Sequence, residues 1–242
     1  MKMSLLTSSM FLSSFLLGAC LGTGDPEPDV DTGSQSATTC ASVMIITARA
    51  STEAAGEGIT GALVTQIINS STQNIARASV SYPATLNNYA SSSLQGINAL
   101  KSQLTTEVQN CPNEKIVLAG YSQGAHVVLD VLGGGQGGSQ LGTATPPIAA
   151  NIASHVVAVA TFGDPRHVPN QAFDLGTSRR NGRFPRSSTQ LGVLSGFASR
   201  INAWCDTNDT FCDGGFSTQV HLTYLDRYQT AAAQFVLGKI GG

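Results

Sequence analysis

The fold is decided by the stretch Lys115-Ile-Val-Leu-Ala-Gly-Tyr-Ser-Gln-Gly-Ala-His-Val-Val-Leu-Asp130. An apolar strand pattern leads into Gly120-Tyr121-Ser122-Gln123-Gly124, and a helical pattern follows at once. Gly-x-Ser-x-Gly between a strand and a helix is typical of a nucleophile elbow. The turn is so sharp that the serine must adopt a φ angle above zero. Side chains two positions before and after it would collide, and glycines stand there.

This turn would aim the Ser122 hydroxyl outward at the carboxyl end of a sheet. It would also leave the Gln123 N–H at the start of a helix, where a developing oxyanion is stabilised. A purely structural turn is the alternative in a chain rich in glycine and serine. The strand before the motif and the helix after it favour a catalytic serine.

Length and charge limit the classes of protein that the chain can belong to. Its 242 residues fit one domain with a sizeable core once the N-terminus is set aside. The formal net charge of −2 shows no nucleic-acid footprint. No segment reaches the ~20 apolar residues of a membrane-spanning helix. We expect a single-domain monomer.

Residues 1–19 are typical of an export signal peptide. Lys2 supplies the positive start, and residues 5–17 form a short apolar stretch diluted by serine and threonine. The sequence Leu17-Gly18-Ala19-Cys20 then resembles the bacterial lipobox, which implies cleavage before Cys20 and its acylation. An ordinary signal peptide, in which Cys20 has no role, is the alternative. The lipobox is favoured because there are five cysteines and the other four can pair.

Residues 20–39 predict a lipid-anchored, flexible acidic tether. The stretch after Cys20 holds four acidic residues, two prolines and only two large apolar residues, so no core can form there. The folded domain is expected over residues 40–242, without a repeat or a second domain. The protein would be exported, as a cell-surface or periplasmic lipoprotein or in secreted form.

Strand and helix patterns alternate through this domain. Apolar residues in 91–110 fall on one helical face, and the last helix shows a similar spacing from Tyr224 to Phe235. Short strands dense in apolar residues suit a parallel sheet buried on both faces. The alternation predicts an α/β fold, a compact three-layer sandwich around a mostly parallel sheet of about five strands. The expected strands are 42–47, 77–82, 115–120, 155–162 and 200–204.

The remaining four cysteines fit this sheet. Cys40 and Cys111 each lie just before a strand, so they would meet at its amino edge if those strands are neighbours. Cys205 and Cys212 would close a tight loop after the last strand. Disulfides are the natural interpretation in an exported protein, although four cysteines allow three connectivities. A zinc site is less favoured, because no Cys-x-x-Cys or histidine pair accompanies them.

A serine nucleophile needs a base and an acid that orients it. In this fold the chain order is serine, acid, histidine. His221 follows the last strand and precedes the last helix, where the base is expected. His126 comes before any possible acid and is interpreted as a packing residue, whereas His155 opens a strand and His167 lies too early. Asp209, inside the Cys205–Cys212 loop, is the favoured acid; its rivals are Asp164, Asp206 and Asp213.

Three motifs together resemble the cutinase and acetylxylan esterase family, small secreted serine esterases with an α/β-hydrolase fold. They are Gly120-Tyr-Ser-Gln-Gly124, Cys205-Asp-Thr-Asn-Asp209-Thr-Phe-Cys212 and His221-Leu-Thr-Tyr224. The resemblance spans about residues 40–240 and implies a triad of Ser122, Asp209 and His221. The segment Ala48-Arg-Ala-Ser51-Thr-Glu53 is similar to the family's oxyanion loop. It implies that Ser51 joins the Gln123 N–H in the oxyanion hole.

The resemblance implies a two-step acyl transfer that needs no cofactor and no metal. His221 would take the Ser122 proton, Asp209 would hold the imidazole tautomer, and water would release the acid. The expected substrates are carboxylic esters with short to medium acyl groups, as in cutinases: polyesters, lipid esters or acetylated polysaccharides. An acetylxylan esterase is the alternative within the family. A lipid-anchored binding protein on the same fold is the non-enzymatic alternative.

Two further segments are expected near the substrate. Residues 214–220, which lead to His221, would line the acyl site, with Phe216 and Val220 as their apolar members. Residues 163–198 form a long segment with five arginines. It either shapes the rim of the site or is solvated surface, and solvated surface is the default interpretation.

Overall fold

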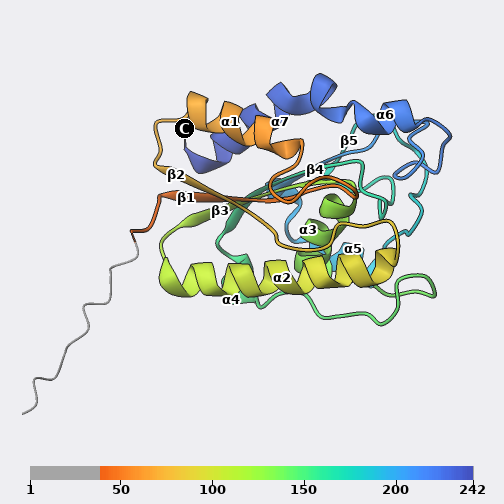
Figure 1. Cartoon of the computed structure of the whole chain (residues 1–242), viewed down its shortest axis with the longest axis horizontal. Coiled ribbons are helices and arrows are strands. Elements are labelled where there is room, and N and C mark those ends of the chain that lie inside the picture. Colours follow the sequence, from red (N-terminus) through yellow and green to blue (C-terminus); the bar gives the residue numbers. More distant parts are fainter. Residues whose placement is uncertain (1–38, 242) are drawn as a thin grey trace, which may run out of the picture. The chain divides into compact units, whose positions relative to one another are not determined.

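The computed structural model describes residues 39–241, which contain a six-stranded sheet with helices on both faces (Figure 1). The expected signal peptide, Cys20 and nearly all of the expected tether lie outside these residues. The strand order is β2-β1-β3-β4-β6-β5, and every pairing is parallel. The strands are β1 Val43–Ala48, β2 Ile75–Ser79, β3 Lys115–Tyr121, β4 Val156–Phe162, β5 Asp174–Leu175 and β6 Ile201–Trp204.

The sequence prediction of about five strands misses β5. This strand has two residues and pairs only with the end of β6, so it is too short to produce a recognisable pattern. The second strand also lies slightly earlier than the predicted 77–82, because its pairing with β1 runs from Ile75 to Ser79. The other four strands match their predicted ranges to within one residue.

The helices divide between the two faces of the sheet. α1 (Thr60–Ser70) and α7 (Tyr224–Ile240) cover one face; α2 (Tyr89–Asn110), α3 (Gln123–Gly133), the short α4 (Ala150–Ala153) and α5 (Ser188–Ser195) lie on the other (Figure 1). α6 (Thr218–Leu222) lies directly before α7, and the 3₁₀ turn η1 (Ala198–Arg200) precedes β6. None of the helices in residues 39–241 is both long and apolar enough to cross a membrane.

Successive strand residues enter opposite cores. Ile45 packs in the core under α1 and α7, whereas Ile46 packs in the core under α2 and α3. The predicted apolar face of α2 is buried at Ile97, Leu100 and Leu104. Burial on both faces explains why the central strands β1, β3 and β4 are apolar at nearly every position rather than at alternate ones.

Two disulfides brace this scaffold, one between distant segments and one across a short loop. Cys40 is bonded to Cys111 and Cys205 to Cys212. Of the three connectivities that the sequence allows, this is the one that neighbouring strands predicted. The first bond lies at the amino edge of β1 and β3, which are paired in the sheet.

Residues 163–198 match the default interpretation of a solvated segment only in part, since Arg179, Arg180 and Arg183 are exposed. Arg166 and Arg186 are almost completely buried, and both form ion pairs with Asp130 of α3. Asp164 pairs with Arg186, so two carboxylates balance two guanidinium groups. Burial alone would raise the pKa of Asp130, but His126 and the two arginines hold it well below its usual range.

His126, interpreted from sequence as a packing residue, is fully buried and belongs to this polar network. Its Nε2 lies 3.0 Å from Asp130 Oδ2, and its Nδ1 lies 3.0 Å from the Tyr89 hydroxyl. The network therefore joins α2, α3 and the 163–187 segment directly beside Ser122.

Candidate active site

Ser122 stands between β3 and α3 with φ 53° and ψ −115°. The positive φ is the strained conformation that the nucleophile elbow predicts. A Cβ at Gly120 would lie 2.6 Å from the Gly124 carbonyl oxygen, and a Cβ at Gly124 would lie 1.8 Å from the Ala48 carbonyl oxygen. Both glycines are thus required because the backbone of the elbow packs closely against itself and against β1. The collision with the serine that was expected from the sequence is not the reason.

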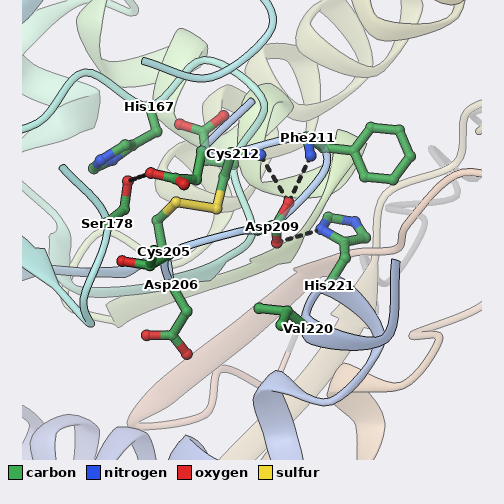
Figure 2. The surroundings of a disulfide bond; sticks show 12 residues. His167, Ser178, Cys205, Asp206, Asp209, Phe211, Cys212, Val220 and His221 are labelled. Carbon is green, nitrogen blue, oxygen red and sulfur yellow. Dashed lines mark hydrogen bonds and ion pairs between the residues drawn. A yellow bond between two sulfur atoms is a disulfide. The ribbon is translucent and has the colours of Figure 1, made fainter. Parts of the chain in front are cut away.

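His221 lies in α6 and is bound to Asp209. Its Nδ1 is 2.8 Å from Asp209 Oδ2, and Figure 2 shows the carboxylate between the imidazole and the Cys205–Cys212 disulfide. Both side chains are buried. A histidine held through Nδ1 presents its Nε2 to whatever lies on the other side of the ring.

The loop closed by Cys205 and Cys212 directs backbone donors at the Asp209 carboxylate. Oδ1 accepts the N–H of Phe211 at 2.6 Å and that of Cys212 at 2.9 Å. Oδ2 also accepts the Tyr224 hydroxyl at 2.9 Å. Burial alone would raise the pKa of Asp209, but the bond to His221 and these N–H donors lower it below its usual range. The acid is held as a fully bonded carboxylate.

The three rival acids are engaged elsewhere. Asp164 pairs with Arg186, Asp206 with Arg227 and Asp213 with Arg180. The other histidines are also away from the candidate pair: His155 faces the Glu114 carbonyl, and His167 faces Asp174.

The segment after β1 is fastened beside the elbow. Ala50 N–H donates to the Glu53 carboxylate at 2.6 Å, and Thr52 N–H donates to the Ala84 carbonyl at 2.7 Å. Ser51, between them, is partly exposed and lines the same groove as Ser122. The Gln123 N–H lies in the first turn of α3, where no acceptor within the helix exists. Ser51 therefore borders the groove, whereas the buried Gln123 follows Ser122 at the start of α3 without lining it.

A groove of about 520 Å³ brings these residues together. Ser122, His221 and Ser51 line it, while Asp209 lies behind His221. Within the described residues, Ser122 and His221 share no hydrogen bond, as is common in sites without substrate. Of residues 214–220 only Thr218 lines the groove, since Phe216 is 92% exposed and Val220 is not in contact with it. The remaining walls include Leu86, Tyr89, Pro165, Arg183, Phe184, Phe211 and Leu222.

A model of the cutinase family matches residues 39–240, nearly all of the part that the structure describes. The chain belongs to the cutinase family.

Its relatives include both branches that the sequence suggested. Cutinase 11 of Verticillium dahliae is 34% identical, with 83% of this chain and 70% of the relative covered. Acetylxylan esterase of Hypocrea jecorina is 30% identical, with 93% and 75% covered. The solved catalytic core domain of acetyl xylan esterase from Trichoderma reesei superposes with a TM-score of 0.77 at 29% identity, over 83% of this chain and 100% of that one.

This cutinase-family chain is a carboxylic ester hydrolase with the α/β fold of these enzymes. The non-enzymatic interpretation, a binding protein on the same fold, finds no support among these relatives.

Three positioning residues of this cutinase-family site were missed from sequence. A Cβ on Gly163, whose φ is +63°, would lie 2.8 Å from His221 Cε1, so only glycine leaves room for the imidazole. Tyr121 donates its hydroxyl to the His221 carbonyl, and Tyr224 bonds Asp209. Tyr121 lies inside the elbow motif and Tyr224 lies three residues after His221. Their closeness in sequence to the predicted site residues was the only signal that could have indicated a positioning role.

One acidic cluster lies away from the groove. Glu107, Cys111 and Glu114 gather their ligand atoms near the amino edge of the sheet, but the Cys111 sulfur is committed to its disulfide. This arrangement leaves the two carboxylates as the remaining ligand groups of the cluster.

Proposed function

We propose that the protein is an exported serine esterase in which Ser122, His221 and Asp209 carry out acyl transfer. The observation that carries this proposal is the 2.8 Å contact between His221 Nδ1 and the buried Asp209 carboxylate, in a groove that also contains Ser122 in a strained elbow. The two disulfides fit an exported protein.

The mechanism follows from these positions. His221 Nε2 takes the proton as Ser122 Oγ attacks the ester carbonyl, and the Gln123 N–H with Ser51 stabilises the oxyanion. The alcohol leaves with the proton from His221, and water then repeats the cycle on the acyl-enzyme. Asp209 remains ionised and stabilises the imidazolium.

The groove favours esters with short to medium acyl chains. Leu86 and Leu222 line it and are 58% and 60% exposed. Exposed apolar side chains gathered at one mouth suit an apolar substrate or its surface. Acetylxylan esterase activity is the second candidate, supported by the superposition on the Trichoderma reesei enzyme.

A substrate series separates the two candidates. The purified protein should hydrolyse p-nitrophenyl octanoate at least as fast as the butyrate, because the apolar walls accept the added methylenes. Polyester release should exceed acetate release from acetylated xylan. Preference for the acetyl ester together with rapid xylan deacetylation would establish the acetylxylan esterase instead.

A lipid anchor at Cys20 and a monomeric state complete the proposal. The four paired cysteines leave Cys20 without a disulfide partner among them. Expressed in a bacterium, the protein should incorporate labelled palmitate and fractionate with membranes, because several acyl chains anchor firmly. Cys20→Ser should abolish the label. Unlabelled wild type in the medium, with another N-terminus, would mean simple secretion.

A further inference from the structure

Arg183 stands in the wall of the Ser122 groove with an unpaired charge. Among the nine arginines, all of which lie in residues 39–241, it alone has a guanidinium without a hydrogen bond, ion pair or ring contact. Its neighbours in the chain are engaged: Arg180 pairs with Asp213, Arg186 with Asp130 and Asp164, and Arg179 donates to the Ser178 carbonyl.

The backbone at Arg183 is nevertheless fixed. Its N–H donates to the Phe211 carbonyl at 2.9 Å, and the next N–H, of Phe184, donates to the Pro165 carbonyl at 2.9 Å. The Phe211 ring in turn packs against His221, with 4.5 Å between centroids. These contacts fix the Arg183 backbone close to the catalytic histidine. Its exposed guanidinium has no hydrogen-bond or ion-pair partner within residues 39–241.

The surroundings contain no carboxylate that could neutralise this charge. No acidic residue lines the groove within the described part of the chain. Arg183 and Phe184 also border an adjoining hollow of about 150 Å³, whose other walls include the neutral residues Gly138, Ser139 and Gln140. A substrate that extends from Ser122 past Phe184 therefore meets one positive group among neutral ones.

We propose that Arg183 forms an anion subsite, which selects esters that carry a carboxylate close to the scissile bond. The proposal rests on the proposed function, because the groove must hold the ester. A guanidinium presents paired N–H donors that match the two oxygens of a carboxylate. A carboxylate on the substrate would therefore form the ion pair that no residue within 39–241 forms with Arg183. The carboxylate can come from the free end of a polyester chain or from a uronic acid group on an acetylated polysaccharide.

Two pairs of small esters test the subsite. The first is the p-nitrophenyl hemiester of glutaric acid against its neutral methyl ester, with the carboxylate on the acyl side. The second is 4-butyryloxybenzoate against its methyl ester, with the carboxylate on the alcohol side. In at least one pair, Arg183→Gln should lower the ratio of kcat/KM values, anionic to neutral, by about threefold to fivefold. Arg183→Lys should retain part of the preference, and 0.5 M salt should reduce it in the wild type.

Arg179→Gln is the matched control, since Arg179 is an exposed arginine of the same segment that does not line the groove. It should leave both ratios at the wild-type value. Unchanged ratios in Arg183→Gln for both pairs would overturn the proposal. If the neutral esters are not cleaved at all, the proposed esterase function fails instead. Binding of the hemiester to Ser122→Ala, measured by titration, then tests the subsite alone. Weaker binding to the double variant Ser122→Ala/Arg183→Gln supports the subsite, and equal binding overturns it.

The source of the carboxylate is identified with polymers. One comparison uses an oligoester with a free or a methyl-capped carboxyl end, and the other uses acetylated xylan before and after reduction of its uronic acids. An Arg183-dependent preference in either comparison supports the subsite and names the substrate. Its absence from both contradicts it.

Discussion

Ser122→Ala is expected to lower kcat/KM for p-nitrophenyl butyrate by about 10⁴-fold or more, because the variant has no atom to attack the ester. Folding should be retained. Alanine accepts the positive φ of the elbow about as well as serine does, and no hydrogen bond of the Ser122 hydroxyl is lost. Steady-state kinetics and a thermal unfolding curve measure the two effects.

A serine-directed phosphonate provides an independent measurement of the same residue. The wild type should gain one equivalent by intact mass, and Ser122→Ala should gain none. Ser195→Ala, on the exposed side of α5, is the matched control and should react like the wild type. A Ser122→Ala variant that keeps more than a hundredth of the activity would refute the mechanism.

Asp209→Asn is expected to reduce kcat by about 10³- to 10⁴-fold at neutral pH. The asparagine amide would donate toward His221 Nδ1, which favours the tautomer that carries its proton on Nε2 and so blocks that atom as a base. The Phe211 and Cys212 N–H groups can still bond the remaining oxygen, so the loop should keep its shape. Kinetics as a function of pH measure the loss.

The acid limb of stability gives a second measurement on Asp209. Its pKa is below the usual range in the folded state, so the carboxylate stabilises the fold above the unfolded pKa near ~4 and this contribution is lost as the pH falls through the folded value. Asp209→Asn should therefore show a shallower decline in Tm on acidification.

Two further variants test the assignment of Asp209 as the acid of the triad. Asp206→Asn alters a carboxylate in the same disulfide loop that pairs with Arg227, and it should keep activity within about tenfold of the wild type. Asp164→Asn should lower stability by breaking the buried pair with Arg186, but should retain catalysis per folded molecule. If Asp164→Asn is inactive while folded and Asp209→Asn is active, the acid has been misassigned.

Local patterns accounted for much of this molecule. The elbow, four of the six strands and the α2 face each depend on residues close together in the chain. There the periodicity of apolar residues and the positions of glycines indicate the backbone conformation directly. The pairing of Cys205 with Cys212 is likewise a local closure. These elements could be predicted because their physical cause lies within a short window of sequence.

The misses have long-range causes. Nothing near Asp130 indicates that its partners are Arg166 and Arg186, which lie 36 and 56 positions later. A cluster of arginines normally indicates a solvated segment, and only the tertiary fold brings these two to a buried carboxylate. The role of Gly163 is of the same kind, because its clash would be with His221 from a distant helix.

The seven-residue closure around Asp209 predicts that the proposed activity depends on the redox state of the compartment in which the protein folds. A reducing cytosol keeps such thiols open, and the open loop forgoes the ~2–3 kcal/mol that ring closure contributes to a defined conformation. The acid then relies on its noncovalent contacts alone to stay aligned with the imidazole. For an exported protein, as proposed, we expect full activity only after translocation and oxidation, which would protect the esters of the cell that makes it.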